Sequence, residues 1–232
     1  MSFFEYAWNV LPALLSGAGA TLALFAVVII ISLPLGFLVT LMAKSNIFIF
    51  RWFAKAYIFV LRGTPLLLQL LFVYFGLPNI PIIGDYLILD RFPAACIAFV
   101  LNYAAYFAEI FRGGLLSVDK GQYEACKVLG ISKFQTMIKV ILPQMLRVSL
   151  PSVSNETITL VKDTSLLYAI AVPEILHYAK VAVTRDFRIT AFVVAAVIYL
   201  VFTFILTLIF RALEKKYKNG TDIKNRRRKD SF

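Results

Sequence analysis

Acidic and metal-binding side chains are scarce in this sequence of 232 residues, which holds 13 Asp and Glu, one His and two Cys. An integral membrane transferase or protease needs a nucleophile beside a base, or a cluster of metal ligands. His177 stands alone, while Cys96 lies in an apolar run and Cys126 in a polar loop, so we expect reduced thiols and neither kind of site. The glycine-rich phosphate loop that ends in Gly-Lys-Ser/Thr is also absent. We therefore expect this chain to be no enzyme and to bind no metal, ATP or other cofactor.

Charge of either sign is missing from four long stretches of the chain. Residues 6–43, 63–84, 92–108 and 189–210 contain no Asp, Glu, Lys or Arg, and 60% of all residues are hydrophobic. A helix needs about 20 apolar residues to cross a bilayer. Only 16% of the residues are charged, against about a quarter in soluble domains. The chain is therefore predicted to be an all-α integral membrane protein.

The positive charge that is present is unevenly spread. The formal net charge is +11, and residues 211–232 hold nine Lys and Arg against three acids. No folded basic domain or aromatic platform of the kind that binds nucleic acid accompanies them, so no nucleic-acid partner is expected. Basic residues gather on the cytoplasmic face of membrane proteins. The tail, 212–232, is predicted to be a cytoplasmic anchor on anionic headgroups of the lipid bilayer, with docking of a partner as the alternative.

The same charge bias predicts an orientation. The first eight residues hold one charged group, Glu5, whereas 44–62 and 112–139 hold four and five basic residues. These two loops are placed inside, and the segments 78–91 and 174–188 outside. A single domain of about five transmembrane helices results, with the N-terminus out and the C-terminus in. The expected spans cover approximately residues 18–43, 65–77, 92–112, 143–163 and 190–211, the first being retained rather than cleaved as a signal peptide.

The fourth expected span is unusually polar. It carries Glu156 and, nearly two turns later, Lys162 and Asp163, with Asn155 and several hydroxyl side chains nearby. Polar groups in a span face the bundle interior or a wet cavity, so this helix is predicted to line a pathway. In the alternative, structural interpretation, Glu156 pairs with Lys162 or Arg147.

The second inside loop contains a short amphipathic helix, predicted at about 121–131. Ala125, Val128 and Leu129 form its apolar face, Glu124 lies on its polar side, and Gly130 ends it. A short rigid helix that projects from a bundle suits docking into a groove on another protein.

Several motifs resemble those of known transporters. In order, they are Arg62-Gly63-Thr64-Pro65 with Gln69, Glu109-Ile110-Phe111-Arg112-Gly113-Gly114, Glu124-Ala125-Cys126 with Gly130 and Leu142-Pro143, and Asn155-Glu156 followed by Lys162-Asp163-Thr164-Ser165-Leu166. The third closely resembles the EAA loop of ATP-binding-cassette (ABC) importer permeases, with Cys126 in place of the second Ala. Together they are similar to the polar amino acid subfamily of type I permeases, of the histidine, glutamine, arginine or cystine type. Glu109 and Arg112, three residues apart, are predicted to pair on one helix face.

The resemblance implies a MetI-like permease fold with a cytoplasmic coupling helix, in a prokaryotic cytoplasmic membrane. Its partners would be a second permease copy or a paralogue, two ATPase subunits that use ATP and Mg²⁺, and an extracytoplasmic amino-acid-binding protein. The residues implied in ATPase coupling are Gly121, Tyr123, Glu124, Ala125, Leu129, Gly130, Ile131 and Pro143. The expected function is import of a polar amino acid. A stand-alone secondary transporter or channel is the alternative, which the lack of a visible inverted repeat disfavours.

A zwitterionic substrate requires a polar site near the midplane that is reached from alternate sides. Glu156 can accept from an α-ammonium group or a basic side chain, and Asn155 offers neutral hydrogen bonds. The hypothesised substrate pathway comprises Asn155 and Glu156, with an outer part formed by Asp163, Thr164 and Ser165 and an opposite side formed by Arg62, Thr64 and Gln69.

Overall fold

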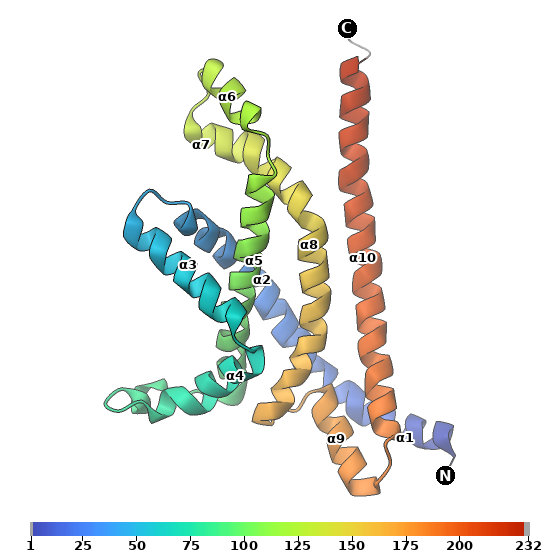
Figure 1. Ribbon diagram of the computed structural model, residues 1–232. Coiled ribbons are helices and arrows are strands. Elements are labelled where there is room, and N and C mark those ends of the chain that lie inside the picture. Colours follow the sequence, from blue (N-terminus) through green and yellow to red (C-terminus); the bar gives the residue numbers. More distant parts are fainter. Residues whose placement is uncertain (1, 230–232) are drawn as a thin grey trace.

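The computed structural model describes the backbone of residues 2–229 and the side chains of residues 2–217, and every regular element in this range is helical. The α-helices are α1 (Phe3–Ser16), α2 (Ala18–Ala43), α3 (Phe48–Gly63), α4 (Leu66–Leu71), α5 (Arg91–Leu116), α6 (Lys120–Val128), α7 (Lys133–Gln135), α8 (Leu142–Asp163), α9 (Ile175–Asp186) and α10 (Thr190–Lys229). Figure 1 shows α6 and α7 at one end of the molecule and α4 and α9 at the other.

Three of these helices are long and apolar enough to cross a membrane by themselves: α2, α5 and the Thr190–Tyr217 part of α10. Two further candidates are bent. The first joins α3 to Leu66–Asn79 with a bend of 107°, and the second joins Lys133–Ile170 to α9 with a bend of 53°. The described residues thus contain three candidate spans, or five if each bent pair crosses once.

The structure differs from the expected loop between the first two spans, because residues 48–63 form the helix α3. The expectation of a loop rested on Arg51, Lys55 and Arg62, but these alternate with apolar residues at helical spacing. Trp52 and Phe59, for example, are 63% and 80% exposed on this helix. Basic side chains on an amphipathic helix reach past its apolar surface to water or headgroups, so they do not require a loop.

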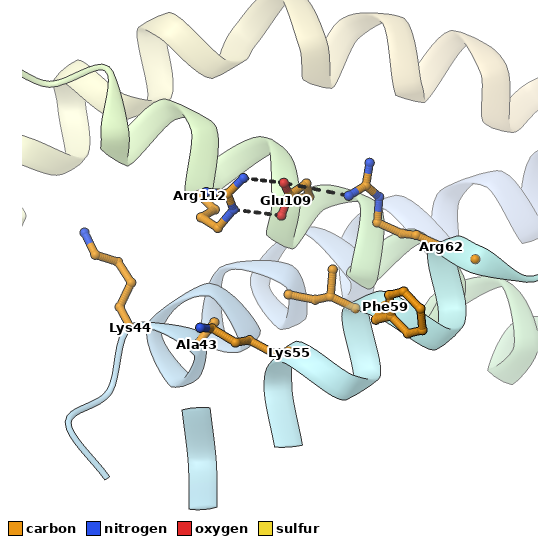
Figure 2. Close-up of a pocket in the computed structure, with 9 residues that line it drawn as sticks. Ala43, Lys44, Lys55, Phe59, Arg62, Glu109 and Arg112 are labelled. Atoms are coloured by element: carbon orange, nitrogen blue, oxygen red, sulfur yellow. Dashed lines mark hydrogen bonds and ion pairs between the residues drawn. The ribbon is translucent and has the colours of Figure 1, made fainter. Parts of the chain in front are cut away.

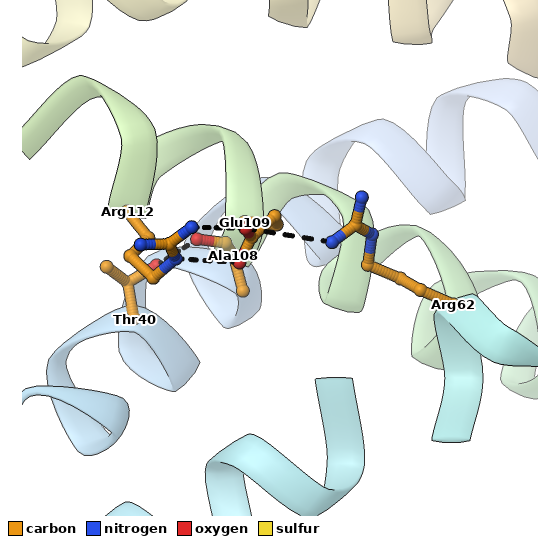
Figure 3. Close-up of polar contacts among 5 residues, drawn as sticks. All are labelled: Thr40, Arg62, Ala108, Glu109 and Arg112. Atoms are coloured by element: carbon orange, nitrogen blue, oxygen red, sulfur yellow. Dashed lines mark hydrogen bonds and ion pairs between the residues drawn. The ribbon is translucent and has the colours of Figure 1, made fainter. Parts of the chain in front are cut away.

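Close packing of α2 on α5 forms the centre of the main core. Thr40 Oγ1 donates to the carbonyl oxygen of Ala108 across this interface at 2.9 Å (Figure 3). A Cβ atom on Gly36 would lie 2.8 Å from Cβ of Phe107 and 2.9 Å from the carbonyl oxygen of Ala104. The two helix backbones therefore approach as closely as they do only because residue 36 has no side chain.

We expect Gly36→Ala to destabilise the protein by about 1–3 kcal/mol, the usual effect of overpacking a filled core. Gly19→Ala is the matched control on the same helix, because a Cβ atom there meets nothing within 4 Å. Thermal unfolding in detergent measures both variants. A melting temperature for Gly36→Ala equal to that of Gly19→Ala would show that the α2–α5 contact is looser than described.

A second core lies where α9 folds back against α1 and α10. Glu174, whose side chain is fully buried, begins α9 and accepts hydrogen bonds from the backbone N–H groups of Leu176 and His177 at 2.8 and 2.6 Å. Tyr199 on α10 donates its hydroxyl to the same carboxylate at 2.6 Å. Glu174 therefore holds α9 to α10, a role that its sequence context does not predict.

Candidate substrate pathway and coupling helix

Two acidic side chains lie on one face of α8, since Glu156 and Asp163 are seven residues apart and so almost two full turns. Asp163 accepts a hydrogen bond from the hydroxyl of Tyr103 on α5 at 2.7 Å. Glu156 is half-buried and lies within electrostatic reach of Asp163 and Arg62. Within residues 2–217 it forms no ion pair with Lys162 or Arg147. The structural alternative for Glu156 therefore has no contact to support it.

The sharp bend between α3 and α4 is held by a network of amide groups. Gln69 Nε2 donates to the carbonyl oxygen of Leu61 at 2.8 Å and to Thr64 Oγ1 at 2.7 Å. Asn102 on α5 donates to Gln69 Oε1 at 2.9 Å and to the Leu61 carbonyl oxygen at 3.1 Å. Thr64 and Gln69 thus satisfy backbone groups that the break leaves free. Asn102 was not predicted, although it is the only amide side chain in the uncharged run 92–108.

Arg62 connects this bend to a pair of charges on α5. Glu109 accepts two hydrogen bonds from Arg112, of which the one from Nε measures 2.8 Å, so the predicted pair is confirmed. Arg62 Nη1 lies 3.8 Å from the same carboxylate (Figure 3). Its guanidinium group also lies 5.3 Å from the ring centroid of Tyr106. Its charge also acts on Glu156 of α8, although the two side chains form no ion pair within residues 2–217.

The remaining pathway candidates do not all face this cluster. Thr164 is fully buried, and its hydroxyl donates to the carbonyl oxygen of Val161 at 2.8 Å. Ser165 lines a shallow cavity with Lys162 and Tyr199, beside α10 rather than α5. Asn155 is exposed next to Glu156. The structure therefore brings Asp163 together with Tyr103, whereas it buries Thr164 in the core and places Ser165 beside α10.

The α6 helix has a defined start and end. The Asp119 carboxylate accepts from the backbone N–H of Gly121 at 2.5 Å, which caps the first turn. At the other end Gly130 has φ of +71°, and the N–H of Ile131 donates to the carbonyl oxygen of Cys126 at 2.9 Å. A residue other than glycine rarely adopts this left-handed turn. The chain then reverses into α7 and α8.

One side of α6 faces the protein and the other does not. Cys126 is buried and Tyr123 is half-buried against the main core. Val128 and Leu129 are 87% and 74% exposed. Glu124, Ala125 and Pro143 are also exposed, with Pro143 at the start of α8. The end of the molecule at α6 thus presents an apolar surface that nothing in the described chain covers.

Among residues 2–217, no three His, Cys, Asp or Glu side chains gather as metal ligands. His177 is half-buried on α9, with its ring edge-on to Tyr178.

Comparisons with known proteins show the family to which this chain belongs. Residues 32–219 match the family described as the binding-protein-dependent transport system inner membrane component. The chain is 39% identical over 221 residues to the probable amino-acid ABC transporter permease protein YckA of Bacillus subtilis (strain 168), covering 92% of this chain and 96% of the relative. It is 39% identical over 211 residues to the arginine transport system permease protein ArtQ of the same organism, covering 90% and 94%.

A solved structure described as an amino acid ABC transporter with histidines has the same fold. It superimposes with a TM-score of 0.83 at 31% sequence identity, over 93% of this chain and 99% of that chain. The resemblance to ABC importer permeases that the sequence motifs indicate is confirmed. This chain belongs to the family of binding-protein-dependent transport system inner membrane components, as a multi-pass permease subunit of an ABC importer in the cytoplasmic membrane.

Proposed function

We propose that this permease imports a polar amino acid that carries a net positive charge, with Glu156 and Asp163 as its cation-binding groups. The observation that carries the proposal is the pair of half-buried carboxylates on one face of α8, neither of which has a cation at ion-pair distance in the described range. Unpaired acids inside a membrane protein are costly and mark ion or substrate pathways. An amino acid with an α-ammonium group and a cationic side chain offers one partner to each carboxylate.

Arg62 supplies the opposite charge for the substrate. Its guanidinium group lies 3.8 Å from Glu109 and acts electrostatically on Glu156, with which it forms no ion pair at contact distance. Guanidinium groups bind carboxylates with two parallel hydrogen bonds. The α-carboxylate of the substrate would therefore bind on the Arg62 side, while its cationic groups bind on α8. The name of the relative ArtQ, an arginine permease, supports the same substrate class.

The proposed assembly contains a second permease copy or a paralogue, two ATPase subunits and an extracytoplasmic amino-acid-binding protein. The N-terminus lies outside and α6 inside, where the exposed Val128 and Leu129 enter a groove of the ATPase. ATP and Mg²⁺ are used by the ATPase, and this chain binds no cofactor. The apolar surface of α6 supports this arrangement, since exposed apolar residues at a helix end suit docking into a partner's groove.

A stand-alone carrier or channel is the competing function, and copurification separates the two. We expect an affinity-tagged chain from its own host to bring down an ATPase in stoichiometric amount, and uptake by the reconstituted complex to stop without ATP. A tagged chain that brings down no ATPase and transports without ATP would support the lone carrier instead.

A further inference from the structure

A basic cavity of about 570 Å³ lies where the end of α2 meets α3 and α5. Its charged lining residues are Lys44, Lys55, Arg62, Arg112 and Glu109. Figure 2 shows these side chains around one opening, with Lys44 just after α2, Lys55 and Arg62 on α3, and Arg112 and Glu109 on α5. The pathway acids Glu156 and Asp163 do not line it.

The charges of this cavity are not balanced. Both arginines lie against the single carboxylate, since Arg112 binds Glu109 through two hydrogen bonds and Arg62 lies 3.8 Å from it. Within residues 2–217, neither Lys44 nor Lys55 has a carboxylate at ion-pair distance. Four cations against one anion leave a formal excess of three positive charges around one cavity. Such a cluster attracts an anion that carries several acceptor oxygens.

The surroundings of the cavity indicate which anion it takes. Its apolar lining includes Ala43, Ile58 and Phe59, the last 80% exposed. Trp52 and Phe53 are also exposed on α3. Aromatic side chains of this kind lie at membrane interfaces. A ligand that fits this cavity therefore combines an anionic group with several oxygen atoms, such as a phosphate, with apolar chains.

We propose that the cavity binds the phosphate headgroup of an anionic phospholipid, with Lys44 and Lys55 as the principal contacts and the acyl chains against α3. The proposal rests on the proposed orientation, which places the Lys44 end of α2 on the cytoplasmic side. There, basic pockets between membrane helices bind anionic headgroups. The same phosphate chemistry is offered by free inorganic phosphate, which lacks the apolar part.

Lipid titration of the detergent-purified permease complex tests the proposal, with native mass spectrometry as the readout. We expect phosphatidylglycerol to bind at least about fivefold more tightly than phosphatidylcholine. The double variant Lys44→Gln/Lys55→Gln should lose this preference. Lys133→Gln/Lys139→Gln is the matched control, because it removes two exposed lysines from the segment between α6 and α8, which contributes nothing to the cavity. The single variant Lys55→Gln, with an intermediate preference expected, serves if the double variant does not fold.

Four results would overturn the proposal. The first is an equal affinity of the wild type for the two lipids, and the second is an undiminished preference for phosphatidylglycerol in the Lys44 and Lys55 variants. The third is protection against thermal unfolding by millimolar inorganic phosphate as large as that by phosphatidylglycerol, which would assign the cavity to the free anion. A cysteine cross-link between Lys55→Cys positions of two copies, insensitive to added lipid, would assign it to a permease interface. Lipid binding is measured without transport, so none of these results depends on the identity of the amino acid.

Discussion

Glu156→Gln is expected to lower ATP-driven uptake of arginine by roughly 30-fold or more. Removing one partner of a desolvated charge pair costs about 2–5 kcal/mol, and each 1.4 kcal/mol is a tenfold change in binding. The substitution keeps the size of the side chain and removes its charge, so it isolates the electrostatic contribution. Asp163→Asn should also lower uptake, because it weakens the hydrogen bond from Tyr103 as well as the attraction for a cation.

Uptake is measured with proteoliposomes that contain the complete complex. The binding protein is placed inside or outside, on the side that the extracytoplasmic face of the permease occupies. Glu214→Gln is the control, since Glu214 lies on α10 and lines a cavity away from Asp163 and Tyr103. It should transport at the wild-type rate. Uptake by Glu156→Gln at the native rate and apparent affinity would remove Glu156 from the pathway and leave it a structural residue of α8.

The second large effect is expected at α6, the proposed coupling helix. Gly130→Pro is expected to abolish ATPase copurification, because proline fixes φ near −65° whereas residue 130 has φ of +71°. The reversal after α6 then cannot form, and Leu129 is displaced. Leu129→Asp, which leaves the backbone unchanged, should reduce ATPase copurification by at least about tenfold, since it places a charge on the surface that we propose enters a groove of the ATPase.

These two variants need a control whose added charge lies outside α6. Ile82→Asp introduces the same charge at an apolar side chain that is 96% exposed but does not belong to α6, and its copurification should be normal. Thermal unfolding in detergent checks that the membrane part of each variant is folded. A folded Leu129→Asp variant with normal ATPase association and stimulation would show that α6 does not couple the two subunits.

Local features of this fold could be predicted from the sequence because they depend on neighbouring residues. The uncharged run before Lys44 predicts a first span at residues 18–43, and α2 occupies the same range. Gly130 marks the end of α6 through capping, which is a short-range effect. Acids in an otherwise membrane-compatible segment indicate α8 as the candidate pathway helix, and this assignment stays a prediction. These inferences needed only helical periodicity, capping chemistry and the energetic cost of a buried charge.

Tertiary pairing could not be predicted in this way. The contact between Tyr103 and Asp163 joins residues 60 apart in the sequence, and neither side chain indicates its partner by type alone. Arg62 lies beside Glu109 because residues 48–63 form the helix α3. The basic residues of this segment had suggested a loop. Thr164 follows Asp163 directly but is turned into the core. Each successive residue of a helix is rotated by about 100° around the helix axis. Neighbouring residues of one sequence motif therefore lie on different faces of the helix.

The most direct test of the central claim compares arginine with citrulline, its neutral isostere, for binding to the permease–ATPase complex in detergent without the binding protein. If the two acids of α8 recognise a cationic side chain, arginine should displace radiolabelled arginine at least tenfold more effectively than citrulline does. In Glu156→Gln that difference should shrink to about threefold or less. Equal displacement by arginine and citrulline in the wild type would contradict the account, because the site would then recognise shape and the α-amino acid group without the side-chain charge.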